Sequence, residues 1–270
     1  MLLAIDIGNS SIGLGLFRGE TLAATAKLSA DTKRSADEYA VIIRGLLSAN
    51  SISPCDISHA IISSVVPKLT HTVQQALAWQ DIASPIPVMT VGGGVKTGIN
   101  LKVDDPSGLG ADIVTNATAA VKKHGAPAVI VDIGTATVIS CVNPQKALVG
   151  VAIAPGPITA QEGLHQSAAL IPYAELSRPS ATLGKNTPAA LRSGLVVGHA
   201  CMIDGMVDRI IREQNLSPDT PVVITGGLSS LIMEECQHPM TYEKDLTLWG
   251  LYHIYTATVA AQNKKVDSLP

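Results

Sequence analysis

Apolar runs typical of β-strands alternate along the chain with segments in which apolar residues recur at helical spacing. The pattern predicts strands at residues 2–5, 11–17, 21–28, 60–66, 87–91, 128–131, 137–142, 148–153 and 222–225. It predicts helices at residues 35–48, 68–79, 113–123, 189–213 and 246–261. Ser35 and Glu38 fit a capping box at the start of the first helix. This alternation favours an α/β fold in which sheets are covered by helices.

A short internal repeat indicates that this arrangement is built twice. Residues 2–5 lead into Asp6-Ile7-Gly8-Asn9-Ser10, and residues 128–131 lead into Asp132-Ile133-Gly134-Thr135-Ala136. Two further predicted strands joined by a turn follow each copy, so each half opens with a three-stranded meander. We therefore predict two equivalent halves, residues 1–113 and 114–270, each a mixed sheet flanked by helices.

Composition restricts the classes of function. Of the 270 residues, 46% are hydrophobic, 15% are charged and 3% are aromatic, and the formal net charge is −3. These values exclude a disordered chain, and they provide no positive field that would attract nucleic acid. No apolar run approaches the roughly 18 residues that span a bilayer, so we expect a cytoplasmic protein without a membrane partner. The four cysteines form no C-x-x-C pair, which favours reduced, buried thiols over a metal site.

The repeated Asp-Ile-Gly turn has a use in binding phosphate. Glycine lets the backbone approach a phosphate closely, the following amides and hydroxyls donate hydrogen bonds, and the aspartate can hold a divalent cation through water. One such turn is more often only a turn, but two copies at the same structural point indicate a nucleotide held between the halves. Gly134 and Thr135 would then contact the nucleotide from the second half. A third glycine segment, Thr225-Gly226-Gly227, follows a predicted strand and could lie against adenine or ribose, although an ordinary strand-to-helix turn explains it equally well.

Between the two copies lies a segment that is rich in acids and glycines, residues 104–112. Phosphoryl transfer to an alcohol needs a proton acceptor near the attacking hydroxyl. We interpret Asp112 as that acceptor; the alternative is that it only caps the helix that follows. Asp104 and Asp105 fit solvated loop charges. The seven histidines show no ligand spacing, which argues against a catalytic zinc.

These motifs resemble those of type III pantothenate kinases, which belong to the actin-like and sugar-kinase-like ATPases with duplicated ribonuclease-H-like halves. The resemblance covers nearly the whole chain. Residues 6–10 are similar to the family's D-x-G-N-T loop, residues 110–112 to the start of its G-A-D-R motif, and residues 132–136 to its D-x-G-T-A loop. The remaining matches follow in the family's order: Asn186-Thr187, Ser193-Gly194, Ile203-Asp204-Gly205 and Gly226-Gly227.

The resemblance implies a reaction and a set of sites. ATP and pantothenate would give 4'-phosphopantothenate, the first step of coenzyme A synthesis, and Asp112 would be catalytic. The implied ATP and Mg²⁺ site comprises Asp6, Ile7, Gly8, Asn9, Ser10, Ser11, Ile12, Gly13, Thr135, Gly226 and Gly227. The implied substrate site comprises Gly110, Ala111, Asp112, Ile113, Thr187 and Val103. Asp132 would bind a monovalent cation, K⁺ or NH₄⁺, and the family is a homodimer, for which the C-terminal half would supply a helix.

The departures from the family pattern concern the acceptor pocket. Ile113 stands where the family has arginine, Val103 where it has tyrosine, Ala168 where it has threonine and Ile171 where it has leucine. A charge-assisted hydrogen bond from the missing arginine is worth roughly 1.5–3 kcal/mol. The nucleotide loops therefore match the family better than the acceptor loops do.

Three readings stay open. The chain is a pantothenate kinase that holds the substrate's carboxylate with another cation, for which Lys96, Lys102, Arg178, Lys185 and Arg192 are available. Alternatively, it is a related kinase with a less polar alcohol as acceptor. Finally, it is a non-catalytic regulatory relative. Retention of the three aspartates at positions 6, 112 and 132 argues against this last reading.

Overall fold

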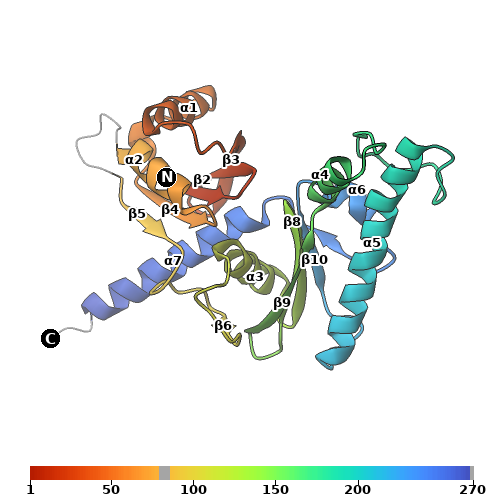
Figure 1. Cartoon of the computed structure of the whole chain (residues 1–270). Helices are drawn as coiled ribbons and strands as arrows, with labels where there is room; N and C mark the ends of the chain where they lie inside the picture. Colours follow the sequence, from red (N-terminus) through yellow and green to blue (C-terminus); the bar gives the residue numbers. More distant parts are fainter. Residues whose placement is uncertain (79–85, 268–270) are drawn as a thin grey trace. The chain divides into compact units, whose positions relative to one another are not determined.

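The computed structural model describes residues 1–78 and 86–267 and contains two compact units. Unit 1 consists of Met1–Gly98, Ser107–Ala119 and the chain from Thr247 onward, and unit 2 of Ile99–Pro106 and Ala120–Leu246. Each unit holds one β-sheet with helices against it (Figure 1).

Unit 1 contains a five-stranded sheet in the order β3-β2-β1-β4-β5. Its strands are β1 (Leu2–Ile7), β2 (Ser11–Arg18), β3 (Thr21–Ser29), β4 (His59–Ser64) and β5 (Val88–Thr90). The first three strands are antiparallel neighbours, whereas β4 runs parallel to β1 and β5 parallel to β4. The carboxyl ends of β1 and β4 therefore lie at the same edge of the sheet, where ligand sites of α/β folds form.

The two faces of this sheet bury different side chains because successive residues of a strand point to opposite faces. Leu3, Ile5 and Ile7 of β1 pack in a core with α1 (Ala36–Ala49) and α2 (Pro67–Ala78). Leu2 and Ala4 pack instead with Leu248, Leu251 and Ile254 of α7 (Leu246–Asp267). Helices thus cover the sheet on both sides, with α7 along the face opposite α1 and α2 (Figure 1).

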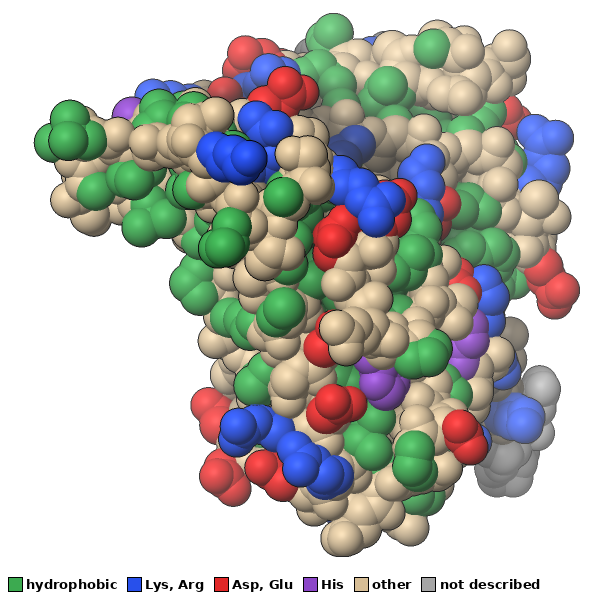
Figure 2. Space-filling model, turned by 90° about the vertical axis from the view of Figure 1, so that its right-hand side faces the viewer, with side chains coloured by type: hydrophobic (Ala, Val, Ile, Leu, Met, Phe, Trp, Pro, Cys, Tyr) green, Lys and Arg blue, Asp and Glu red, His purple; other side chains and the backbone are tan. Residues whose placement is uncertain are grey.

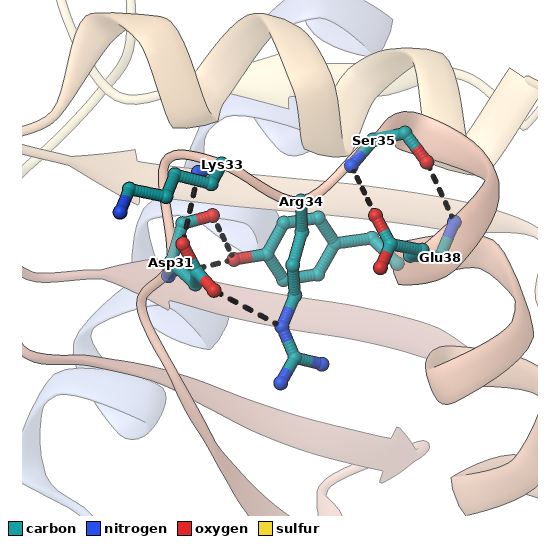
Figure 3. Close-up of polar contacts among 6 residues, drawn as sticks. Asp31, Lys33, Arg34, Ser35 and Glu38 are labelled. Carbon is teal, nitrogen blue, oxygen red and sulfur yellow. Dashed lines mark hydrogen bonds and ion pairs between the residues drawn. The ribbon is translucent and has the colours of Figure 1, made fainter.

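The predicted capping box at the start of α1 is confirmed. The Ser35 amide donates to Glu38 Oε2 over 2.7 Å, and the Glu38 amide donates to Ser35 Oγ over 3.3 Å (Figure 3). The preceding turn is closed by Asp31, which accepts from the Lys33 amide over 2.9 Å and pairs with Arg34 Nε at 3.6 Å (Figure 3). These contacts satisfy amides that a helix start leaves free.

Unit 2 contains a six-stranded sheet in the order β11-β10-β7-β8-β9-β6. Its strands are β6 (Asn100–Leu101), β7 (Ala128–Ile133), β8 (Ala136–Val142), β9 (Ala147–Pro155), β10 (Val222–Gly226) and β11 (Thr241–Tyr242). The 27-residue helix α5 (Thr187–Glu213) packs with one face of this sheet, together with Ile232 of the short helix α6 (Ser229–Met233). Helix α4 (Pro157–Ser167) follows β9, and α3 (Ala111–His124) leads to β7.

The two sheets share one topology, which confirms the predicted duplication. The order β3-β2-β1-β4-β5 of unit 1 corresponds to β9-β8-β7-β10-β11 of unit 2, where β6 adds a strand beside β9. Both meanders carry a register irregularity at the same place, between Leu16 and Phe17 and between Cys141 and Val142. The fold is α/β with duplicated halves, each a mixed sheet flanked by helices.

Most predicted elements lie where the periodicity places them. The elements that periodicity did not predict are α4, α6, β6, β11 and a 3₁₀ turn at Pro54–Asp56. The predicted end of the second helix, Trp79, lies outside the described residues. Expected burial of the cysteines is wrong in part, because all four are free but Cys55 and Cys201 are exposed.

The surface and the helices fit the composition. Charged side chains of both signs are interspersed with exposed hydrophobic ones on the face drawn in Figure 2, as the small net charge leads one to expect. Among residues 1–78 and 86–267, no helix combines the length and apolar character needed to cross a membrane.

Candidate active site

The first Asp-Ile-Gly turn lies at the carboxyl edge of the sheet in unit 1. The Gly8 amide donates to the Ser11 carbonyl over 3.0 Å, which closes the turn between β1 and β2. Directly after β4, the Val65 amide donates to the Ile7 carbonyl over 3.0 Å. A Cβ atom placed on Gly110 would lie 3.5 Å from Val65 Cγ1. The structure therefore brings the Gly110-Ala111-Asp112 segment to the same edge as the Asp6 turn.

Asp112 lies in the first turn of α3, and its carboxylate folds back toward the chain. Its Oδ1 accepts from the Ile113 amide over 2.8 Å, and a Cβ atom at Gly110 would overlap this oxygen. Burial raises the pKa of the Asp112 carboxyl above its usual value, and the bond from the Ile113 amide opposes that rise. The carboxylate binds a helix-start amide and is also a stronger base than an exposed aspartate, so capping and proton acceptance are compatible at this position.

The second Asp-Ile-Gly turn and the Thr225-Gly226-Gly227 segment meet in unit 2. Strand β10 runs parallel to β7, with Thr225 opposite Asp132 and Gly226 opposite Ile133. Gly226 has a positive φ of 107°, and a side chain there would overlap the backbone of Ile133. Glycine is required here because any Cβ would separate the two strands. The two segments that the sequence assigned to ATP are thus neighbours at one edge of this sheet.

Gly156 and Thr159, at the start of α4, also contact the second turn. Neither residue was predicted from the sequence as part of the site. The Thr135 carbonyl accepts from the Gly156 amide over 2.9 Å and from the Thr159 hydroxyl over 2.7 Å. A Cβ atom at Gly156 would overlap the Gly134 carbonyl. The Pro-Gly-Pro sequence at residues 155–157 was a turn signal that could have drawn attention to this segment.

His199 of α5 was also missed, because a histidine on the apolar face of a helix carries no sequence signal. Its Nε2 lies 2.8 Å from the hydroxyl oxygen of Thr137, at the start of β8, and only 8% of His199 is exposed. Burial lowers the pKa of His199 below its usual value, which favours the neutral imidazole. His199 therefore anchors β8 directly after the Thr135 turn.

The remaining predicted substrate residues lie elsewhere in the two units. Thr187 is exposed in the first turn of α5, and Val103 follows β6 in unit 2. Ile113 is buried in α3 with 9% of its surface exposed, so it presents no polar group in place of the family's arginine. His165, near the end of α4, has Nδ1 2.8 Å from the Ile171 carbonyl, and Ala168 caps that helix.

Two of the candidate cations have distinct environments. Arg178 pairs through Nε with Glu235 Oε1 at 2.7 Å and through Nη1 with Glu234 Oε2 at 3.6 Å. Arg192, in α5, has a buried Nε without a hydrogen-bond partner in the described part of the chain. Its guanidinium is always charged, so Arg192 is the better candidate for binding an anion.

The described residues contain no cluster of three or more His, Cys, Asp or Glu side chains that could enclose a metal ion. Single aspartates at the two turns fit a different kind of cation site. Mg²⁺ retains several waters and is commonly held by one or two carboxylates together with substrate phosphates. Asp6 is a single carboxylate at the first turn, as in a site of this kind, and Asp132 is a single carboxylate at the second turn.

Comparisons with known proteins identify the family. The type III pantothenate kinase family model matches residues 2–209. A type III pantothenate kinase of Shouchella clausii is 39% identical over 256 residues, covering 94% of this chain and 98% of the relative. One from Thermobifida fusca is 40% identical over 256 residues, with the same coverage of both chains.

Solved structures agree on the fold. A candidate 2-dehydro-3-deoxygalactonokinase of Sinorhizobium meliloti superposes with a TM-score of 0.59 at 16% identity, over 95% of this chain and 99% of that chain. The activator of 2-hydroxyisocaproyl-CoA dehydratase from Clostridium difficile, solved with bound ADPNP, gives a TM-score of 0.53 at 10% identity, over 100% and 98%. These likenesses show a shared fold alone. The family model and the near full-length relatives show that the chain belongs to the type III pantothenate kinase family.

Proposed function

We propose that this chain transfers the γ-phosphoryl group of ATP to the primary hydroxyl of pantothenate in the cytoplasm. The product is 4'-phosphopantothenate, and the reaction opens coenzyme A synthesis. The observation that carries the proposal is the position of Asp112, a partly buried carboxylate with a raised pKa at the edge where β1 and β4 end. This is the environment that a proton acceptor for an alcohol needs.

We assign the two turns to the nucleotide. Asp6 through Gly13 would surround the phosphates, and Asp6 would hold Mg²⁺; Thr135, Gly226 and Gly227 are assigned to ATP as well. Asp132 would hold the monovalent cation. Once bound, these cations would neutralise the charge that develops on the transferred phosphoryl group. The contacts of Gly156, Thr159 and His199 support this assignment, because they fix the second turn before any ligand binds.

Asp112 accepts the proton of the attacking hydroxyl. Its raised pKa makes it a better base than an exposed aspartate. Gly110 leaves the space that the carboxylate occupies, since a side chain there would displace Oδ1. The rest of the barrier is lowered by holding alcohol and phosphate in line.

We assign the pantothenate carboxylate to Arg192. With Ile113 in place of the family's arginine, another cation must bind the acid, and Arg192 has a buried guanidinium nitrogen that its neighbours in the described residues leave unpaired. Arg178 is already paired with two glutamates. The burial of Ile113 also favours a second candidate function, phosphorylation of a less charged alcohol than pantothenate.

We also propose that the chain is a homodimer. Large hydrophobic side chains of unit 2 are exposed on β9, on α4 and in the segment that follows α4; they are Val151, Ile153, Ile158, Leu164, Leu170 and Leu183. Exposed large hydrophobic side chains become buried when such a surface binds another chain, and they support this proposal. In a dimer Thr187 would contact substrate held mainly by the partner.

The proposal is tested by incubating the purified chain with ATP, Mg²⁺, K⁺ and pantothenate and measuring 4'-phosphopantothenate by mass spectrometry. We expect turnover by the wild type and none by Asp112→Asn, which should still bind ATP. Phosphorylation of another alcohol but not of pantothenate would select the second candidate. ATP binding without turnover of any alcohol would contradict a catalytic role.

A further inference from the structure

The hydroxyl of Ser63, in β4, is buried and unpaired. Ser63 has 0% of its surface exposed, and its Oγ has no hydrogen-bond partner among the described residues. Buried polar groups are nearly always hydrogen-bonded, because a hydroxyl removed from water without a partner costs stability. A ligand that binds beside the Ser63 hydroxyl would supply the missing hydrogen-bond partner.

The neighbour of Ser63 on the adjacent strand is Asp6. Strands β1 and β4 are parallel with Asp6 opposite Ser63, and on the other side of β1 Asp6 lies opposite Gly13. Residues in register on neighbouring strands point to the same face of a sheet. Asp6 is thus bordered by a hydroxyl on one side and by a residue without a side chain on the other.

The next residue, Ser64, provides a contrast. Its hydroxyl oxygen accepts from the Thr70 hydroxyl over 2.7 Å and from the Val66 amide over 3.0 Å. Ser64 is therefore fully engaged in joining β4 to α2. Of the two adjacent serines, one has a structural role and the other retains a free hydrogen-bonding capacity beside Asp6.

We propose that Ser63 is a further binding residue of the nucleotide site. Its hydroxyl donates a hydrogen bond to the Mg²⁺–phosphate group held by Asp6, either to a water of the cation or to a phosphate oxygen. Ser63 gains its missing partner only when that group is bound. This inference rests on the proposed function, because it takes the Asp6 turn as the site of the magnesium nucleotide.

The substitution Ser63→Ala separates a binding role from a structural one. It removes the unpaired hydroxyl, so the ligand-free chain should unfold at the same or a higher temperature than the wild type. Mg²⁺–ATP should bind about tenfold more weakly by calorimetry. For ATP without Mg²⁺, measured in the presence of EDTA, the substitution should reduce the affinity by a smaller factor. The matched control Ser64→Ala should lower the unfolding temperature and leave the affinity for Mg²⁺–ATP within about twofold.

Two results would overturn the inference alone. One is an unchanged affinity of Ser63→Ala for Mg²⁺–ATP when the wild type binds it, and the other is a clear loss of stability of the ligand-free variant. A wild-type chain that binds no Mg²⁺–ATP would overturn the proposed function and this inference with it.

Discussion

The hydroxyl of Thr159 donates to the carbonyl oxygen of Thr135 over 2.7 Å, and so ties the start of α4 to the second Asp-Ile-Gly turn. The Gly156 amide donates to the same oxygen over 2.9 Å. Two donors on one carbonyl restrict the orientation of the peptide that follows Thr135. Preorganised backbone groups of this kind bind phosphate without a reorganisation cost.

Thr159 is not among the residues assigned to the nucleotide. Replacing it should nevertheless weaken ATP binding, because the Thr135 turn loses one of its hydrogen bonds. Thr159→Val keeps the shape but removes the donor, and we expect a two- to tenfold rise in KM for ATP, or a similar fall in kcat, corresponding to about 0.5–1.5 kcal/mol. Thr159→Ser keeps the hydroxyl and should restore wild-type kinetics. Equal kinetics of the valine and serine variants would show that the bond to Thr135 has no effect on the site.

Gly226→Ala should damage the site more severely. The new Cβ would overlap the Ile133 backbone, and alanine is strained at a φ of 107°. We expect at least a tenfold loss of ATP affinity and a lower unfolding temperature, measured by calorimetry and thermal denaturation. The control is Gly198→Ala on the exposed side of α5, where a Cβ atom meets nothing within 4 Å. That variant should gain about 0.5–1 kcal/mol of stability. Unaltered ATP binding by Gly226→Ala would exclude this glycine from the nucleotide site.

Most of the fold could be predicted from local sequence signals. The paired Asp-Ile-Gly turns, the meanders and the Ser35 capping box depend on residues close together in sequence, and the structure confirms each of them. Strand β6 has only two residues and forms by pairing with β9, so no periodicity could reveal it. Helix α4 is short and poorly amphipathic, which leaves its start at Gly156 hidden in the pattern.

The candidate site was predictable only as separate pieces. The sequence identified Asp6, Asp112 and Gly226 by motif, but the contact between Gly226 and Ile133 depends on the register of two distant strands. Ser63 reads as one polar residue at the end of an apolar strand, and its position beside Asp6 follows from the pairing of β1 with β4. Supporting groups of this kind depend on tertiary packing, which local patterns do not encode.

The raised pKa of Asp112 predicts that the substitution Asp112→Asn lowers activity and raises stability. The folded-state pKa of Asp112 is raised, so the native state binds a proton more tightly than the unfolded chain, and stability falls as pH rises from about 3.8 through the raised value. Asp112→Asn removes that cost and should be more stable than the wild type at pH 7 by denaturant titration. The wild-type kcat should decline at acidic pH with a midpoint above 3.8, because protonation removes the proposed proton acceptor. A variant less stable than the wild type at pH 7 would contradict the raised pKa.

The lowered pKa of His199 predicts that the protein loses stability in mild acid. The folded-state pKa of His199 lies below the usual 6.5, so between these two values the unfolded state binds more protons than the native state. The free energy of unfolding should therefore decrease as pH falls below about 6.5. His199→Gln can keep the hydrogen bond to Thr137 but does not titrate, and it should show a smaller decrease between pH 7 and pH 5.5. Parallel stability curves for the two proteins would show that His199 does not contribute.

Arg192 is the residue that we propose for binding the carboxylate of the acceptor. Its buried Nε lacks a partner within the described residues, and a charged guanidinium gains most from a carboxylate that can use several of its donors. Arg192→Gln should raise KM for pantothenate about tenfold to a hundredfold, corresponding to roughly 1.5–3 kcal/mol, with KM for ATP unchanged. Arg178→Gln is the matched control, because that arginine already pairs with Glu234 and Glu235, and it should leave both constants near their wild-type values. If the glutamine variant at position 192 kept the wild-type KM for pantothenate, Arg192 would not bind the acid. An acceptor without a carboxylate would then become the better explanation for Ile113 at the position of the family's arginine.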